Sequence, residues 1–136
     1  MSKLILNKLK SVVGSNGWIT SKNELTPYIT EWRDILEGNP LIVLLPNSTK
    51  EVSDIIKICA YHKIAIVPQG GNTGLCGGAI PDKSGKQVII SLKNLNRIRK
   101  LIKDEHVVVL EAGCILSKIH EKMERNNLSF PIDMSS

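Results

Sequence analysis

The chain has 136 residues, of which 42% are hydrophobic and 23% charged, and its formal net charge is +5. This length suits one ordinary domain, and this composition permits a packed core and disfavours disorder. Aromatic residues make up only 4% of the chain and the lysines form no dense run, which argues against nucleic-acid binding.

The N-terminal segment MSKLILNKLKSVVG predicts an amphipathic helix. Its apolar side carries Leu4, Ile5, Leu9, Val12 and Val13. Because lysines interrupt this segment, it is too short and too broken for a signal peptide or a membrane span. We therefore assign residues 1–36 to a helical lead-in and expect no integral membrane segment.

A polar segment follows, up to Trp32 and Arg33. Either both residues pack over the first strand, or Arg33 pairs with Glu31 or Asp34, and we assign them no chemistry. The apolar run PLIVLLP then predicts a short buried strand over residues 41–45.

The next segment, NSTKEVSDIIKICAYH, begins with Ser48 and Glu51 at the spacing of a capping box. The helix that it predicts has a set of apolar residues on one face, namely Val52, Ile55, Ile56, Cys59 and Ala60. A second strand, KIAIV, follows. A strand–helix–strand unit of this kind favours parallel pairing with a right-handed crossover.

The second half of the chain predicts a third strand over residues 87–91 and a fourth strand from His106 to Gly113. Between them, we interpret LNRIRKL as a turn and a short connection. Apolar residues at helical spacing (Ile115, Leu116, Ile119 and Met123) then predict a helix that ends near Asn126. The expected fold is α+β, with a small parallel sheet flanked by helices.

The most informative stretch is VPQGGNTGLCGGAIP, residues 67–81, which follows the second strand and holds five of the ten glycines. Glycine-rich turns can direct several backbone amides at phosphate oxygens. Gln69, Asn72 and Thr73 would add hydrogen-bonding side chains. A mobile surface loop is the alternative interpretation.

Two common phosphate motifs do not fit this stretch. A Walker A loop is excluded because Gln87 follows Gly85-Lys86 and Ile80 occupies the place of the first glycine. A dinucleotide G-x-G-x-x-G motif is excluded by Asn72 and Thr73, and a strand rather than a helix follows. Any phosphate here would be bound by turn amides alone.

The run IVPQGGNTGLCGG resembles the pyrophosphate-binding loop of the FAD-linked oxidases of the vanillyl-alcohol oxidase (PCMH-type FAD-binding) family. The resemblance extends to TEWRDILEGNPLIVLLPNSTKEVSDIIKIC before the loop, and to SLKNLNRIRKL and VVVLEAGCILSKIHEKMERNNLSFPID after it. It covers about residues 25–136, and the D-2-hydroxyacid dehydrogenases are the most similar branch. These include D-lactate, D-2-hydroxyglutarate and glycolate dehydrogenases.

The resemblance implies that the loop binds the diphosphate of FAD, and that the fold is the first subdomain of the FAD-binding domain with the start of the second. Carried over position by position, the FAD-binding residues would be Pro68, Gln69, Gly70, Gly71, Asn72, Thr73, Gly74, Leu75, Gly77, Gly78 and Ala79, with Pro131 and Asp133 as weaker candidates. No histidine lies between Lys63 and Asp104, so we expect non-covalent FAD.

The remaining polar residues suggest no catalytic or metal site. Cys76 is expected to pack as a small residue rather than act as a nucleophile or flavin ligand. The histidines, His62, His106 and His120, are expected to be structural or exposed, and Glu111 and Asp133 to be isolated carboxylates. The three cysteines, at positions 59, 76 and 114, predict neither a disulfide framework nor a zinc site. We therefore expect a reducing, cytoplasmic location.

In the resembling family, a second FAD-binding stretch and a substrate domain follow a segment like FPIDMSS. Residues 1–136 therefore correspond to a partial FAD-binding domain, and the substrate domain, with its catalytic residues, is expected to be absent. The expected activity of the intact protein is hydride transfer from a D-2-hydroxyacid to FAD, with this chain alone inactive. Two alternatives remain. The chain could be a non-enzymatic module that forms a homodimer or binds a partner such as the missing C-terminal segment. The loop could also bind another nucleotide or free phosphate.

Overall fold

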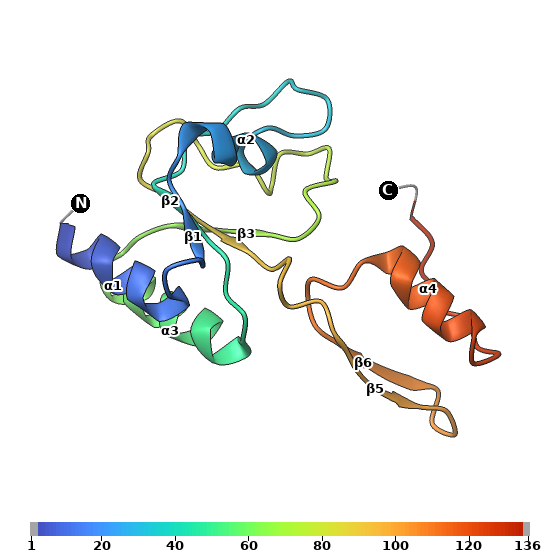
Figure 1. Ribbon diagram of the computed structural model, residues 1–136. Coiled ribbons are helices and arrows are strands. Elements are labelled where there is room, and N and C mark those ends of the chain that lie inside the picture. Colours follow the sequence, from blue (N-terminus) through green and yellow to red (C-terminus); the bar gives the residue numbers. More distant parts are fainter. Residues whose placement is uncertain (1–2, 135–136) are drawn as a thin grey trace.

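The computed structural model describes residues 3–134 and contains two helix-and-sheet units joined by a short connection (Figure 1). Its elements in chain order are α1 (Lys3–Val13), β1 (Trp18–Ile19), α2 (Lys22–Ile29), β2 (Ile42–Leu44), α3 (Thr49–Tyr61), β3 (Ile66–Gln69), β4 (Val88–Ser91), β5 (Ile98–Ile102), β6 (Val107–Leu110) and α4 (Leu116–Glu124). The first unit runs to β4 and the second from β5 to the end of the described chain.

The first unit is built on a four-stranded sheet with the order β1-β2-β4-β3. β4 pairs in parallel with both β2 and β3, while the edge strand β1 is antiparallel to β2. The α+β fold with a parallel sheet is therefore confirmed. The strands on either side of α3 run parallel as predicted, but they are not neighbours, because β4 lies between them.

Helices cover both faces of this sheet, and alternate residues of each strand face opposite sides (Figure 1). Ile42, Leu44, Val88 and Ile90 pack with Leu9 and Val13 of α1 and with Ile55 and Cys59 of α3. On the other face, Val43, Leu45, Val67 and Ile89 pack with Leu25 and Tyr28 of α2. Burial on both faces explains why the strand sequences are continuously apolar.

The capping box at the start of α3 is confirmed. The Ser48 hydroxyl accepts a hydrogen bond from the backbone amide of Glu51 (3.1 Å). The Glu51 carboxylate reaches back to the amide of Asn47 (2.8 Å), one residue before the N-cap. These bonds fix the point at which the chain leaves β2 and enters the helix.

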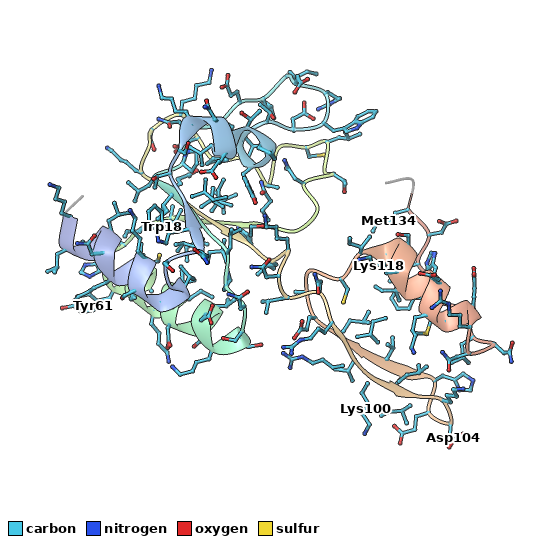
Figure 2. All side chains as sticks on the ribbon, viewed as in Figure 1. Trp18, Tyr61, Lys100, Asp104, Lys118 and Met134 are labelled. Atoms are coloured by element: carbon cyan, nitrogen blue, oxygen red, sulfur yellow. The ribbon has the colours of Figure 1, made fainter. Side chains whose placement is uncertain are left out.

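The second unit contains a hairpin and one helix. β5 and β6 pair antiparallel in a separate two-stranded sheet, and α4 follows. Figure 2 shows Asp104 at the outer tip of this hairpin. The interpretation of LNRIRKL as a turn and connection was wrong, because most of it forms β5. A register shift between Ile98 and Lys100 interrupts the alternation that would have indicated a strand.

Candidate functional site

The glycine-rich stretch begins where β3 ends. Gln69 is the last residue of β3, and residues 70–79, called the glycine loop below, leave the carboxyl end of this strand. In open α/β sheets, ligands bind outside the carboxyl ends of the strands. The glycine loop therefore occupies a position suited to a ligand.

The backbone amides of the glycine loop are not used by the fold. Across residues 3–134, no amide of residues 70–79 donates a hydrogen bond to another part of the chain. The next amide, that of Ile80, donates to the Gly77 carbonyl (3.0 Å) and closes a turn at the end of the loop. Turn amides without an acceptor in the protein are the groups that can bind phosphate oxygens.

Most glycines of the loop are not required by the chain itself. A Cβ atom added at Gly70, Gly74 or Gly78 would meet nothing within 4 Å, and none of the three has a positive φ. At Gly71 the nearest atom would be Thr73 Cγ2, at the ordinary distance of 3.7 Å. A group outside the chain that lies close to the backbone would account for glycine at these positions. The loop thus offers both the hydrogen-bond donors and the open space that a diphosphate would need.

Gly77 differs from these glycines. Its φ is +76°, and an added Cβ would lie 2.5 Å from Leu36 Cδ1. The chain itself therefore requires glycine at this position. Substitutions can therefore distinguish Gly77 from the uncrowded glycines of the loop, Gly70, Gly71, Gly74 and Gly78.

The Gln69 side chain points into the protein rather than toward a ligand. It is buried, and its Nε2 donates to the carbonyls of Tyr28 and Ala79 (both 2.9 Å). The prediction that its side chain would be ready for a bound ligand is therefore not met. Gln69 instead ties the start of the loop to its end and to α2, while Thr73 is exposed as a ligand-binding side chain should be.

The Asn72 side chain also serves the fold. Its Nδ2 donates to the carbonyls of Thr30 (2.8 Å) and Pro27 (3.2 Å), at the end of α2. Its φ is +56°, which reverses the chain locally. Within the described residues, the buried Oδ1 atom has no hydrogen-bond partner. The backbone of Asn72 remains a candidate for FAD binding, but its side-chain nitrogen is already committed.

A tight turn lies against the glycine loop. Residues 31–36, called the turn segment below, are organised by the buried carboxylate of Glu31, which accepts hydrogen bonds from the amides of Arg33 and Ile35 (both 3.1 Å). Arg33 Nε also donates to Glu31 (3.3 Å), and Arg33 Nη2 donates to the Leu75 carbonyl in the middle of the loop (2.5 Å). The predicted pairing of Arg33 with Glu31 is confirmed.

The environment of Glu31 favours its charged form. Burial raises the pKa of Glu31, but the two backbone hydrogen bonds and the Arg33 guanidinium outweigh this effect, so the pKa lies below its ordinary value. Trp32, next in the chain, is 79% exposed and does not pack over the first strand. The sequence suggested the pairing of Arg33 with Glu31 but not the burial of Glu31 or the contact of Arg33 with the glycine loop.

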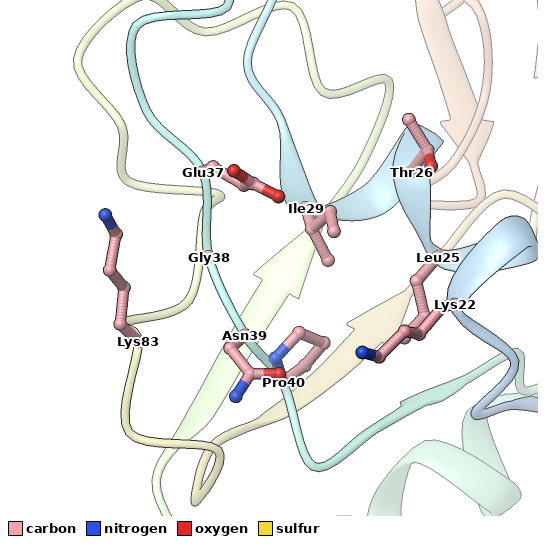
Figure 3. Close-up of a pocket in the computed structure, with 9 residues that line it drawn as sticks. All are labelled: Lys22, Leu25, Thr26, Ile29, Glu37, Gly38, Asn39, Pro40 and Lys83. Carbon is pink, nitrogen blue, oxygen red and sulfur yellow. The ribbon is translucent and has the colours of Figure 1, made fainter.

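Two shallow pockets lie beside the loop and the turn segment. One of about 590 Å³ is lined by Leu36, Val67, Gly77, Gly78 and neighbouring residues of the loop exit. The other, of about 580 Å³, lies between α2 and residues 37–40, with Lys22 and Lys83 on opposite sides (Figure 3). The first shares two glycines with the glycine loop and is the better placed to receive a ligand held there.

The remaining predicted FAD-binding residues are accessible. Pro68, just before the loop, and Leu75, in its middle, are exposed, and Ala79 at the end of the loop is half-buried. Pro131 and Asp133 lie in the extended segment after α4 and are exposed. His120 on α4 contacts the Ile132 carbonyl through Nε2 (2.9 Å), which holds this segment in place. Their contacts with FAD stay predictions.

The cysteines differ in exposure and the histidines remain apart. Cys76 is exposed in the loop, and Cys59 is buried in the core, which raises the pKa of its thiol to about 11. His62 makes an edge-on contact with the Tyr61 ring (4.9 Å between centroids). Within residues 3–134, no group of three or more His, Cys, Asp or Glu side chains is arranged to hold a metal ion.

Glu111 is not isolated, contrary to our expectation. Its buried carboxylate accepts hydrogen bonds from the side chains of Arg97 (2.9 Å) and Arg99 (3.0 Å) and from the Arg97 amide (2.9 Å). These donors, the Arg97 side chain foremost, lower the pKa of Glu111 to about 2. Arg99 also reaches the Thr49 hydroxyl (3.4 Å). Glu111 therefore stabilises the base of the hairpin, where Arg99 also contacts the first residue of α3.

Comparison with known proteins identifies the family. Residues 40–136 match the family model described as an FAD binding domain. The chain belongs to this family. FAD is therefore the cofactor that this domain binds, as the resemblance implied, and the open glycines and unused amides lie within the matched residues.

Individual relatives agree with this assignment. The chain is 34% identical over 127 residues to the mitochondrial D-2-hydroxyglutarate dehydrogenase of Arabidopsis thaliana, covering 93% of this chain and 22% of the relative. Among solved structures, p-cresol methylhydroxylase with substrate bound superposes with a TM-score of 0.76 at 26% identity, covering 94% of this chain and 26% of that chain. Alkyldihydroxyacetonephosphate synthase shares the fold, with a TM-score of 0.85 at 17% identity over 98% and 27% of the two chains.

The chain thus spans about a quarter of the length of these proteins. Throughout residues 3–134, each helix is too short or too polar to cross a membrane. The domain boundaries predicted from the sequence, the subcellular location and the oligomeric state stay predictions.

Proposed function

We propose that this chain forms the diphosphate-binding part of a flavin-dependent oxidoreductase that oxidises a D-2-hydroxyacid such as 2-hydroxyglutarate, lactate or glycolate. One observation carries the proposal. The glycine loop combines amides that no other part of the described chain uses with glycines that no described neighbour crowds. The D-2-hydroxyglutarate dehydrogenase of Arabidopsis thaliana, similar over 93% of this chain, supports the substrate class.

When bound, FAD supplies the acceptor for the hydride that leaves the α-carbon of the hydroxyacid. The chain's own part in this reaction is to bind and orient the cofactor. Amides of residues 70–79 would donate to the diphosphate oxygens, and the lack of side chains at Gly70 and Gly74 would let the cofactor approach the backbone. We propose that the groups that bind substrate and remove its hydroxyl proton lie in the three quarters of the relatives' length that this chain does not match.

The test is flavin retention by the purified chain. FAD is added, free flavin is removed by gel filtration, and the visible absorbance and flavin fluorescence of the protein fraction are recorded. We expect retained, non-covalent flavin that denaturation releases, because the loop offers no histidine for covalent attachment. ADP should compete with FAD if the diphosphate contacts dominate. A folded chain that retains no flavin, and binds neither FAD nor ADP in titration, would contradict the proposal.

A second candidate function is association with another copy or another protein. It is favoured by exposed apolar side chains on the turn segment and glycine loop, namely Trp32, Ile35, Leu36 and Leu75. Light scattering tests it, because a clean monomer at high concentration argues against self-association. A stable dimer without flavin would favour this function over the first.

A further inference from the structure

The C-terminal end of α2 and the turn segment lie against the glycine loop. Three side chains join the two sides of this contact through four hydrogen bonds, and they are spaced along the loop. Gln69 bonds to the Tyr28 carbonyl at the start of the loop. Asn72, three residues further along the chain, bonds to the carbonyls of Thr30 and Pro27. Arg33 then bonds to the Leu75 carbonyl near the middle.

The contact at Leu75 is the most exposed of the three and the most dependent on charge. Gln69 is buried, and Asn72 is half-buried and donates to two carbonyls. Arg33 is 42% exposed, yet its guanidinium is fixed at one end by the fully buried Glu31 carboxylate. Without Glu31, the long Arg33 side chain would lose a large rotamer entropy on reaching a single carbonyl.

Glu31 contributes in two ways. Its carboxylate accepts from the amides of Arg33 and Ile35, which fixes the turn segment. It also accepts from Arg33 Nε at 3.3 Å, which directs the far end of the guanidinium toward the loop. A charged acceptor makes both kinds of bond stronger than a neutral one would.

We propose that Glu31 and Arg33 are positioning residues for FAD, acting through the Leu75 carbonyl to hold the glycine loop in the conformation that leaves its amides unused. The inference deepens the proposed function and rests on it for the identity of the ligand. The effect on the loop, however, exists without any ligand. Because Arg33 already orders the loop, FAD binding does not carry the entropy cost of ordering it.

The first experiment measures loop order in the flavin-free chain. Backbone ¹⁵N relaxation gives order parameters for residues 70–79 in the wild type, in Arg33→Met and in Arg33→Lys. The matched control is Arg125→Met, which breaks an exposed Arg125–Glu121 ion pair on α4. We expect wild-type values near those of a rigid backbone, about 0.85, and a fall toward about 0.6 in Arg33→Met around residue 75 only. Arg33→Lys should lie between, because one amine cannot bridge Glu31 and Leu75.

The second experiment measures FAD affinity by fluorescence quenching in the same variants. Arg33→Met is expected to weaken binding at least tenfold with a melting temperature within about 3 °C of the wild type, and Arg125→Met to change neither. Glu31→Gln keeps the shape of the side chain and should also loosen the loop, with its own melting temperature recorded. Arg33→Lys should recover part of the affinity.

The outcomes separate the two proposals. Unchanged order parameters in Arg33→Met, or a loop already mobile in the wild type, would overturn the positioning role. Loosened loops with unchanged FAD affinity would also overturn it. If the wild type binds no FAD, the proposed function fails, and the relaxation data alone still decide whether Arg33 positions the loop.

Discussion

The glycine loop and the turn segment lie against each other and use their backbones in opposite ways. In the turn segment, the amides of Glu31, Arg33, Asp34 and Ile35 all find acceptors inside the chain. In the glycine loop, no amide does so within the described structure. The glycine loop thus leaves its donors unused while side-chain bonds connect it to α2 and the turn segment.

Glycine is present for different reasons in the loop and beside the turn segment. Gly38, just after the turn segment, is crowded, because an added Cβ would lie 2.3 Å from the Pro81 carbonyl oxygen. Gly70 and Gly74 in the loop have open space around them. Gly38 therefore reports close packing, whereas Gly70 and Gly74 report room for a ligand.

The largest expected effect is that of Gly38→Ala. The new Cβ would meet Pro81 backbone and ring atoms at 2.3–2.8 Å, so the segments before β2 and before β4 must move apart. We expect a loss of about 3 kcal/mol in the free energy of unfolding, the upper end for overpacking. Urea denaturation measures it, and a midpoint equal to that of the wild type would contradict the described packing.

The next largest effect is expected for Gln69→Leu. Leucine keeps the apolar part of the side chain but leaves the carbonyls of Tyr28 and Ala79 without their donor. We expect a loss of about 1–3 kcal/mol in the free energy of unfolding. Thr73→Val, an exposed change in the same loop, is the control and should leave the urea midpoint nearly unchanged. Equal midpoints for both variants would show that the Gln69 bonds do not hold the loop.

A pH-dependent effect is expected at Glu111, outside both regions. Its pKa is lowered from an ordinary 4.5 to about 2, first of all by the Arg97 side chain. A carboxyl group with a lowered folded-state pKa stabilises the fold above its unfolded pKa, and this contribution is lost as the pH falls from about 4.5 to about 2. As the pH falls from 5 to 2, the free energy of unfolding should therefore decrease less in Glu111→Gln than in the wild type. Urea midpoints across this range measure it, and parallel curves for the two proteins would contradict the assignment.

The smallest effect on stability is expected for Gly70→Ala. Its φ is not positive and its Cβ meets nothing within 4 Å, so alanine costs no packing and lowers the entropy of the unfolded chain. We expect the free energy of unfolding to change by no more than about 0.5 kcal/mol. A large loss in urea denaturation would mean that the loop packs against the rest of the protein, and the contrast with Gly38 would disappear.

Much of the first unit could be predicted from the sequence. Short apolar runs bounded by proline or turn residues predicted β2 and β4, and Ser48 with Glu51 predicted the start of α3. The helix α2 could not be predicted in detail, because Pro27 lies inside it and only Leu25 and Tyr28 are buried on the sheet. The position of β4 between β2 and β3 depends on long-range pairing that no local pattern records.

The cofactor could be predicted from the sequence, but the contacts inside the glycine loop could not. The density of glycine in residues 67–81 indicated a loop for an anion, and the match to the FAD binding domain family confirms FAD. The side chains of Gln69 and Asn72 were expected to face a ligand, yet they bond to the end of α2, more than 40 positions earlier in the chain. Only the tertiary structure brings α2 and the turn segment against the glycine loop.

The most direct test of the account is the FAD dissociation constant of the double variant Gly70→Ala/Gly74→Ala, measured by fluorescence quenching beside the wild type. Ser117→Ala, an exposed change on α4, is the control. We predict at least a tenfold weaker affinity for the double variant, with an unchanged urea midpoint, because the added methyl groups occupy space that the fold leaves open for the cofactor. Equal FAD affinity in the double variant and the wild type would contradict the central claim that the glycine loop holds the flavin.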